Sequence, residues 1–491
     1  MSSLSGRQLA ACLALCACNQ GDLGATPGTG GTGGDAPGDP IASGGRAPTP
    51  SAGGSAGSAT AEPDPIEATL TVDLGQRFQV LEGFGASVAW YGDWLTTHPR
   101  KREIYELVFR ELGLDILRLR NSYREVGGDF DPVAAELVSE ATASLGHAPR
   151  VLLTSWSPPA RLKANGDTEC RGQSTCTLKQ ENGSFSYSEF AEYWRQALHA
   201  YAGLGVNPTW ISIQNEPDFI PPSWEGCRLD ATEGAYPSYQ KALAAVRASL
   251  DRDQLRVGVL GPEVTGLKGD KVQSYAASLD LELLDGIASH LYGSQSWRLP
   301  DSYLPEMREV ATQMGGKPIF QTEFSIPGGA GAFETAWLIR NSLVELGASA
   351  YLHWDLVWTG EDGLVSIEDP KQFASWQTAK GYRIRDTYYS LKHFAAFTEP
   401  GDERVAAVSA RPELAPVAFR SEDGRRLTVV TLNTGQQAYR LRIDIPNGSY
   451  RGAELYRTSA SERCQPVGTF VAGQSFTMPP RSIATIVLST R

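Results

Sequence analysis

Two glutamates occupy positions from which they could act together on a glycosidic bond. Glu216 follows Asn215 at the end of a β-type run at residues 210–215, and Glu323 lies near the end of a second run at 318–324. Hydrolysis of such a bond needs one carboxyl group as acid/base and another as nucleophile or base. Asn215 can hydrogen-bond a sugar hydroxyl beside Glu216. The pattern therefore predicts Glu216 as the acid/base and Glu323 as the nucleophile.

Tryptophans stand near the ends of two further runs. Trp156 closes the run at 150–156, and Trp354 closes the run at 348–354. The C–H faces of sugar rings are apolar, and an aromatic ring face suits them. Most Trp side chains in proteins are simply partly buried, so their place at strand ends matters more than their number. Together with the two glutamates, these positions favour a carbohydrate-active site over a chance arrangement.

Such a site needs a scaffold, and residues 66–398 show one. Short β-type runs alternate with amphipathic helical stretches, as βα units should. The eight runs cover residues 82–88, 116–120, 150–156, 210–215, 256–260, 286–291, 318–324 and 348–354. This predicts an α/β fold, the (β/α)8 TIM barrel, whose catalytic groups stand at the C-terminal ends of the strands. A doubly wound open sheet is the main alternative, but no Gly-rich phosphate loop opens the first helix.

The pattern changes at residues 399–491. Four or more β-type runs follow one another, separated by turns such as Asp423-Gly424, and no helix-length pattern remains. This predicts a C-terminal β-sandwich side domain. A further β-type run at residues 69–73, ahead of the barrel, is expected to pair with it.

Five segments together resemble glycoside hydrolase family 30. They are LEGFGAS at 81–87, SWSPP at 155–159, LKANG at 162–166, SIQNEP at 212–217 and QTE at 321–323. The resemblance covers residues 66–491. It implies a barrel with the acid/base on the fourth strand and the nucleophile on the seventh, and a side β-domain built from the C-terminus with one N-terminal strand. It also implies a retaining reaction through a covalent glycosyl-enzyme at Glu323.

Carried over residue by residue, the resemblance implies roles for further side chains. Those expected to contact the substrate are Trp90, Trp156, Asn215, His290, Tyr292 and Trp354. For His290, a contact with sugar, a contact with Glu323 and a structural role all stay open. Arg118 or Arg120, on the second strand, is expected to hydrogen-bond the nucleophile and hold it ionised. Alternation places both arginines on the same face, and we favour Arg118.

Residues 1–18 predict an export signal. Arg7 precedes a short apolar run at residues 9–17, which is too short to span a bilayer as a helix. The sequence LCAC at 15–18 resembles a bacterial lipobox, which would make Cys18 the lipidated first residue. An ordinary signal peptide that contains cysteines is the alternative.

Residues 19–65 consist largely of Gly, Pro, Ala, Ser and Thr and contain no aromatic residue. Such a composition cannot bury enough apolar surface to offset its ordering entropy, so it predicts a flexible tether. We therefore expect an exported protein, either secreted or held at the cell surface. The membrane would be a partner only through the lipid anchor.

Cysteine usage fits an exported protein. Of the seven cysteines, four lie outside the signal region, and they allow three pairings. Cys170 and Cys176 share one loop, so a local disulfide between them is expected, although Cys227 could compete. No Cys/His pair has the spacing of a zinc site. No metal or organic cofactor is expected.

Composition limits the classes of partner. The chain has 44 basic and 56 acidic residues and a net charge of −12, which is the wrong sign for a nucleic-acid partner. Apolar residues make up 41% of the chain, enough for a large core. A polysaccharide is the expected partner, and we expect the protein to be a monomer.

The substrate is harder to predict. The family includes xylanases, β-1,6-glucanases and glucosylceramidases, and the strand-8 region looks most like the bacterial xylanases. Glucuronoxylan-specific members clamp the glucuronate carboxylate with an Arg after strand 8. Residues 355–370 contain no Arg and five acidic residues. We therefore expect cleavage of β-1,4-xylan without a required glucuronate group, unless Arg383 or Arg385 supplies the clamp.

Two alternatives come from other classes of protein. One is a non-catalytic carbohydrate-binding lipoprotein, which the presence of both glutamates argues against. The other is a barrel with different chemistry, such as an aldolase. No Lys stands at a strand end in a Schiff-base context, which argues against that alternative.

Overall fold

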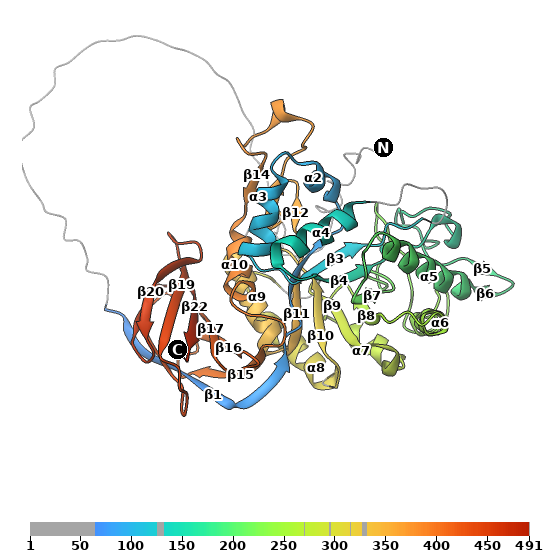
Figure 1. Ribbon diagram of the computed structural model, residues 1–491. Coiled ribbons are helices and arrows are strands. Elements are labelled where there is room, and N and C mark those ends of the chain that lie inside the picture. Colours follow the sequence, from blue (N-terminus) through green and yellow to red (C-terminus); the bar gives the residue numbers. More distant parts are fainter. Residues whose placement is uncertain are drawn as a thin grey trace, which may run out of the picture.

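Eight parallel strands close into a barrel, and a second group of strands lies beside it (Figure 1). The computed structural model describes residues 64–124, 132–269, 271–293, 296–314, 316–326 and 331–490. The barrel strands are β2 (Gly83–Val88), β3 (Ile116–Arg120), β4 (Arg150–Thr154), β7 (Trp210–Ser212), β8 (Gly258–Val264), β9 (Gly286–His290), β10 (Ile319–Glu323) and β11 (Ala348–His353). Strand β11 pairs with β2 and so completes the ring.

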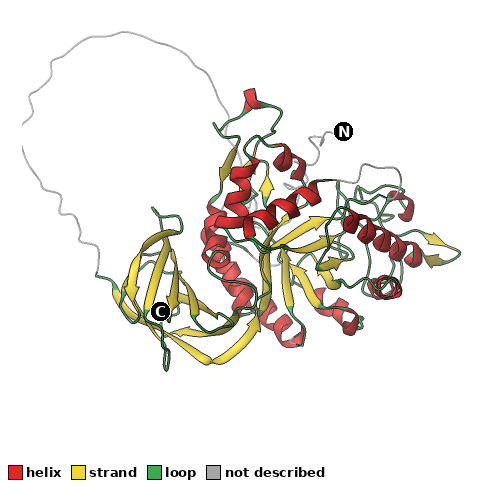
Figure 2. Cartoon of the chain, viewed as in Figure 1, coloured by secondary structure: helices red, strands yellow, loops and turns green. Residues whose placement is uncertain are grey.

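Helices alternate with these strands and cover the barrel from outside (Figure 2). They are α2 (Gly92–Thr97), α3 (Lys101–Tyr105), α4 (Val133–Leu145), α5 (Tyr187–Gly203), α6 (Tyr239–Arg252), α7 (Lys271–Ala276), α8 (Leu304–Met314), α9 (Ala332–Val344) and α10 (Asp386–Ala395). Helix α3 continues directly into a π-helical stretch at Glu106–Glu111. Helix α4 ends at Gly146, whose φ of 80° lies in the left-handed region that commonly ends helices. The alternation of elements confirms the (β/α)8 barrel.

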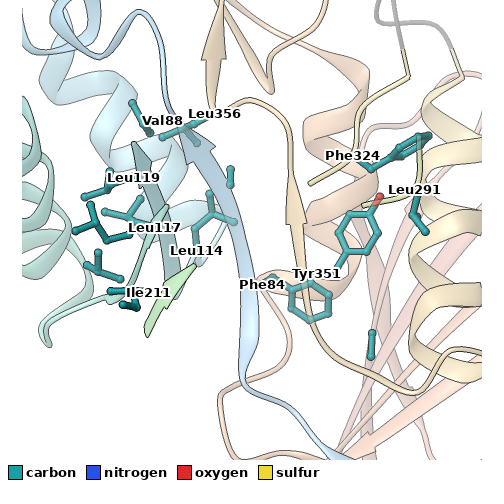
Figure 3. Packing of buried hydrophobic residues seen from close by; sticks show 14 of the residues in the cluster. Phe84, Val88, Leu114, Leu117, Leu119, Ile211, Leu291, Phe324, Tyr351 and Leu356 are labelled. Carbon is teal, nitrogen blue, oxygen red and sulfur yellow. The ribbon is translucent and has the colours of Figure 1, made fainter. Parts of the chain in front are cut away.

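Apolar side chains fill the barrel and cover it. Trp210 and Phe320 meet inside, with ring centroids 5.3 Å apart, in one cluster with Ile116. A larger apolar layer lies between the strands and the helices, and Leu117 and Tyr351 belong to it (Figure 3). Alternation along β3 therefore turns Ile116 inward and Leu117 outward. The next inward residue of this strand is an arginine, at the level of the site.

The second group of strands forms one nine-stranded sheet, in the order β20-β19-β22-β17-β16-β15-β1-β18-β21. Its members are β1 (Ile66–Val80), β15 (Glu403–Ser409), β16 (Leu414–Arg420), β17 (Arg426–Asn433), β18 (Tyr439–Asp444), β19 (Gly452–Thr458), β20 (Gln465–Val471), β21 (Phe476–Met478) and β22 (Ser482–Ser489). The expected sandwich is thus a single sheet that curls around its own apolar core. Strand β1 pairs antiparallel with β15 and parallel with β18.

Helices α9 and α10 lie between the barrel and this side domain (Figure 1). His393, on α10, is fully buried there. Its ring nitrogens lie 2.8 Å from Thr485 Oγ1 on β22 and 2.7 Å from Thr458 Oγ1 on β19. A single side chain of the barrel is therefore hydrogen-bonded to two strands of the side domain.

Two small sheets complete the structure. One contains β12 (Val357–Trp358), β13 (Val365–Ile367) and β14 (Tyr382–Ile384), and the other is the hairpin of β5 (Gln180–Glu181) and β6 (Ser184–Phe185). Within the part of the chain that the structure describes, no helix combines the length and the apolar character needed to cross a bilayer.

Candidate active site

The two predicted catalytic glutamates meet at the C-terminal end of the barrel. Glu216 follows β7, and Glu323 is the last residue of β10. One carboxylate oxygen of each lies within 4.8 Å of the other and of a ring nitrogen of His290. The two glutamates are 7% and 6% exposed. A bond held against this small exposed edge could be reached by both carboxyl groups.

Arg118 is the buried cation beside them. Its Nη1 donates to Glu323 Oε2 at 2.6 Å, and its Nη2 donates to Asn215 Oδ1 at 2.6 Å. The side chain has no exposed surface. Burial alone would lower the pKa of Arg118, but the negative charges of Glu263 and Glu323 raise it above its ordinary value. Glu323 therefore faces a permanent positive charge.

Arg120, the other arginine of β3, lies nearer the rim. Its guanidinium carbon is 4.0 Å from the ring centroid of Trp90. Its Nη1 is 3.4 Å from Glu225 Oε2, on the loop after β7. The two arginines share one face of the strand but differ in depth, so the favoured Arg118 is the one that contacts Glu323.

His290, at the end of β9, is fully buried. Its Nδ1 lies 3.1 Å from Glu216 Oε1, and its Nε2 lies 3.8 Å from oxygens of Glu263 and Glu323. Burial alone would lower the pKa of His290, but these carboxyl groups raise it to about 9. The ring is then an imidazolium at neutral pH and donates from Nδ1 to Glu216. The roles left open were a contact with sugar, a contact with Glu323 and a structural role. The hydrogen bond goes instead to Glu216, and Glu323 lies 3.8 Å away.

Glu216 has the surroundings of a proton donor. Burial raises the pKa of Glu216 above its ordinary value, and the charge of Glu323 acts in the same direction, whereas His290 opposes both. A carboxyl group with a raised pKa keeps its proton closer to neutral pH, as a general acid must. Asn215, beside it, uses its side-chain oxygen to accept from Arg118.

A third carboxylate belongs to the same cluster, and the sequence did not point to it. Glu263 lies on β8, and its fully buried Oε1 accepts from Arg118 Nε at 3.1 Å. Burial alone would raise the pKa of Glu263, but Arg118 and His290 lower it to about 2. The available signal was Gly-Pro-Glu at 261–263, directly after the expected fifth strand.

Aromatic side chains form a wall beside the carboxyl groups. The ring centroids of Trp156 and Trp354 are 5.9 Å apart, and those of Trp90 and Trp156 are 6.4 Å apart. Trp358 continues the series, 5.7 Å from Trp354. Trp156 is almost fully buried, whereas Trp90, Trp354 and Tyr292 keep some exposed surface. These three side chains therefore keep surface that a sugar ring could contact.

Glu216, His290 and Glu323 each offer one ligand atom, and these atoms lie within 4.8 Å of one another. A cation could in principle use this spacing. The Glu323 oxygen already accepts from Arg118, however, and the Glu216 oxygen lies beside the imidazolium of His290. Two positive groups therefore compete with any metal ion, and the donor set fits acid–base chemistry better than a metal centre.

The predicted loop disulfide is present. Cys170 and Cys176 are bonded, with Cα atoms 4.9 Å apart, while Cys227 and Cys464 are buried free thiols. The same loop reaches the loop after β7, because Glu169 forms a β-bridge with Glu225. The predicted lipidation site, Cys18, lies outside the described residues.

The segment after β11 borders a cavity of about 310 Å³ that Trp94 and Trp376 also line. Glu361 of this segment forms an ion pair with Arg385. Glu368 accepts from Thr378 Oγ1 at 2.7 Å. Arg385 and these acidic groups are therefore already engaged within the protein, whereas Arg383, which also lines the cavity, is exposed.

Several known proteins are similar to this chain, although no protein-family model matches it. Glucuronoxylanase XynC of Bacillus subtilis (strain 168) is 24% identical over 451 residues, which cover 86% of this chain and 92% of that protein. Endo-1,6-β-D-glucanase neg1 of Aspergillus fumigatus is 23% identical over 365 residues, which cover 65% and 68%.

The fold is also found among solved structures. The glycoside hydrolase family 30 subfamily 8 xylanase Xyn30A from Clostridium acetobutylicum superimposes with a TM-score of 0.67 at 21% sequence identity. The match covers 86% of this chain and 99% of that one. It includes the barrel and the side domain together.

Proposed function

We propose that the chain is a member of glycoside hydrolase family 30, as the similar proteins support, and that it cleaves β-1,4-linked xylan with retention of configuration. The observation that carries this proposal is the closeness of Glu216 and Glu323, which each place a carboxylate oxygen within 4.8 Å of the other. Retaining enzymes hold their carboxyl groups about 5–5.5 Å apart, whereas inverting enzymes need about 6.5–9.5 Å to admit a water. The short separation supports direct attack by one carboxylate.

The first step forms a glycosyl-enzyme. The Glu323 carboxylate bonds to the anomeric carbon while the bond from that carbon to the leaving oxygen breaks. Glu216 gives its proton to the leaving oxygen, which departs as a hydroxyl group of the released chain. Glu216 thereby becomes a carboxylate, and the imidazolium of His290 at 3.1 Å stabilises the new charge.

The second step returns the enzyme to its starting state. The Glu216 carboxylate takes a proton from a water molecule, whose oxygen attacks the anomeric carbon. The bond to Glu323 breaks, and its electron pair returns to the carboxylate beside Arg118. Two displacements at one carbon leave the sugar with its original configuration.

We propose xylan without a required glucuronate group as the substrate. A glucuronate carboxylate near the segment after β11 would meet Glu361, Glu368 and Asp369, which line the cavity there. Arg383 and Arg385 both line this cavity. Glu361 already engages Arg385, so a substrate carboxylate would have to displace that internal partner. Arg383 is exposed and is the arginine through which a clamp would have to act. β-1,6-Glucan and a β-glucoside are the alternatives within the family.

The substrate is tested by measuring release of reducing sugar from xylan, β-1,6-glucan and a β-glucosyl aryl glycoside side by side. We expect xylan to be hydrolysed fastest. A protein that binds these polymers and cleaves none would be the non-catalytic lipoprotein. Whether cleavage requires the glucuronate group is tested by measuring kcat/KM on glucuronoxylan before and after enzymatic removal of glucuronate. Similar values support the proposal, and a loss of about a hundredfold, roughly 2.7 kcal/mol, would contradict it.

We also propose that the enzyme is a lipoprotein at the cell surface. Its support is the LCAC sequence at 15–18, followed by the tether-like composition of residues 19–65. In a bacterial host fed an alkyne fatty acid, the full chain should become labelled and Cys18→Ala should not. Cys16→Ala is the matched control and should keep the label. An unlabelled wild-type chain in the medium would indicate ordinary secretion.

A further inference from the structure

Glu263 contacts the partners of both catalytic glutamates. Its Oε1 lies 3.1 Å from Arg118 Nε and 3.0 Å from Arg118 Nη2. The same oxygen is 3.8 Å from His290 Nε2. Glu263 has no exposed surface, so it cannot touch the substrate. Any effect on the reaction must pass through Arg118 and His290.

The backbone of Glu263 also positions the acid/base. Its carbonyl oxygen accepts from the Glu216 N–H at 3.0 Å. Glu263 has a φ of 61°, in the left-handed region that a non-glycine residue rarely adopts. The register of β8 against β9 shifts between Pro262 and Val264. This irregularity turns Glu263 toward the barrel interior.

The charges of the cluster balance only when the acid is protonated. Arg118 and His290 supply two positive charges. The Glu263 carboxylate and Glu323, which must be a carboxylate to act as the proposed nucleophile, supply two negative charges, so a protonated Glu216 leaves the buried cluster neutral. That is the state in which the first step begins. Without the charge of Glu263, the cluster would carry an excess positive charge, which buried surroundings disfavour.

We propose that Glu263 is a positioning residue that, through Arg118 and His290, retains the proton that Glu216 must donate. This inference rests on the proposed function, because it takes Glu216 as the acid. It adds a third carboxylate to the pair that performs the chemistry. Its role is electrostatic and structural, without contact to the sugar.

Other ionisable groups near the cluster do not replace this charge. Asp218, behind Glu216, forms an ion pair with Lys271 at 2.6 Å. Burial raises the pKa of Tyr239, which faces Glu263 from α6, well above its ordinary value. Burial likewise raises the pKa of Asp355 well above its ordinary value. Asp218 already has a cationic partner, and burial disfavours the charged forms of both Tyr239 and Asp355.

The test is Glu263→Gln, which keeps an oxygen for Arg118 and removes the charge. We expect the alkaline limb of kcat/KM against pH, measured on an aryl xyloside, to move at least about one unit lower. Loss of a negative charge within about 4–6 Å lowers the pKa of its neighbours by this order. kcat should fall while KM changes little, since Glu263 does not touch the substrate.

Asp115→Asn is the matched control. Asp115 is also a buried carboxyl group, and burial raises its pKa to about 7, but it precedes β3 at the opposite end of the barrel. Its replacement should leave the alkaline limb in place. A Glu263→Gln enzyme with lower kcat and an unmoved limb would overturn the inference. A wild-type enzyme without glycosidase activity would instead overturn the proposed function.

If Glu263→Gln does not fold, a measurement on the wild-type protein tests the inference about Glu263 instead. The chain has six histidines, so ring nitrogens can be followed by NMR after selective 15N labelling, with His290→Gln identifying one signal. We expect His290 to be doubly protonated at pH 7.5. A neutral His290 at that pH would contradict the charge balance from which the inference is drawn.

Discussion

Glu216 and Glu323 carry the same functional group, and their neighbours give them different properties. Glu323 accepts from the guanidinium of Arg118 at 2.6 Å. Glu216 is buried beside His290, and burial raises its pKa. A carboxyl group that keeps its proton suits the acid, and one held against a permanent cation suits the nucleophile. The proposed division of roles thus follows from the immediate surroundings of each glutamate.

Alanine variants with azide should distinguish these roles. Glu323→Ala opens a cavity on the attack face, so azide should attack there and give a glycosyl azide of inverted configuration. Glu216→Ala keeps the nucleophile, so a substrate with a good leaving group should give a product of retained configuration. Without azide, each variant should lose about 10²-fold or more in rate on xylan. Proton NMR of the products measures the configuration.

Glu181→Gln is the control for these variants. Glu181 forms its ion pair with Lys179 near the small hairpin of β5 and β6, outside the catalytic cluster. The Glu181→Gln variant should hydrolyse xylan at the unchanged rate. Azide products of the same configuration from both alanine variants would show that the roles are assigned wrongly.

At the scale of strands, all eight barrel strands could be predicted, because each is a short apolar run between turn residues. For the fifth strand, β8, neither the C-terminal end nor the direction of the Glu263 side chain could be predicted. Its expected end was residue 260, but β8 continues to Val264. Leu260 faces the barrel interior, and simple alternation would then turn Glu263 outward. The register shift and the positive φ reverse that direction, and neither follows from residue types.

A second property that could not be predicted from the sequence is how deep each arginine of β3 lies below the rim of the barrel. Arg118 and Arg120 are two residues apart in β3, so their side chains lie on the same face of the strand. Sequence periodicity alone therefore cannot distinguish them. Their different roles depend on the groups that surround each of them. Glu225, on the loop after β7, holds Arg120 at the rim, while Glu263 and Glu323 surround the deeper arginine. Contacts with a loop and with two other strands, all distant in sequence from β3, decide this.

The loops after β4 and β7 together support the wall formed by Trp90. Glu225 pairs with Arg120 at 3.4 Å and with Arg124 at 3.0 Å. Glu225→Gln should loosen Arg120 over Trp90 and raise KM for xylan about two- to fivefold, the range of partly exposed ion pairs. kcat should change less, because no catalytic carboxyl is touched. Glu181→Gln again serves as the control. An unchanged KM would show that Trp90 is held by other contacts.

At the scale of the whole molecule, His393 joins the barrel to the side domain. Thr485 Oγ1 donates to the carbonyl of His393, so the ring Nδ1 donates to that hydroxyl and Nε2 accepts from Thr458. This arrangement needs a neutral ring. Burial lowers the pKa of His393 to about 3, and Lys392 acts in the same direction.

The sign of the pH effect on stability follows. Below about pH 6.5 the unfolded chain binds a proton at this histidine, and the folded chain does not until about pH 3. Its contribution to stability is therefore present above pH 6.5 and is lost as pH falls, by up to about 1.4 kcal/mol per pH unit. His393→Gln should show a shallower fall of Tm between pH 6.5 and 4 in scanning calorimetry. An equally steep fall would assign the effect to other groups.

Strand β1 has a consequence for the order in which this protein is made. Its 15 residues leave the ribosome before the barrel, yet Val80 pairs with Glu403, and Leu81 donates its N–H to the Asp402 carbonyl at 2.8 Å. Until the C-terminal strands are synthesised, β1 is an edge without partners, which invites pairing with other chains. Translation of the C-terminal strands must therefore be completed before the side sheet can close, and a chain truncated after the barrel would keep that aggregation-prone edge permanently.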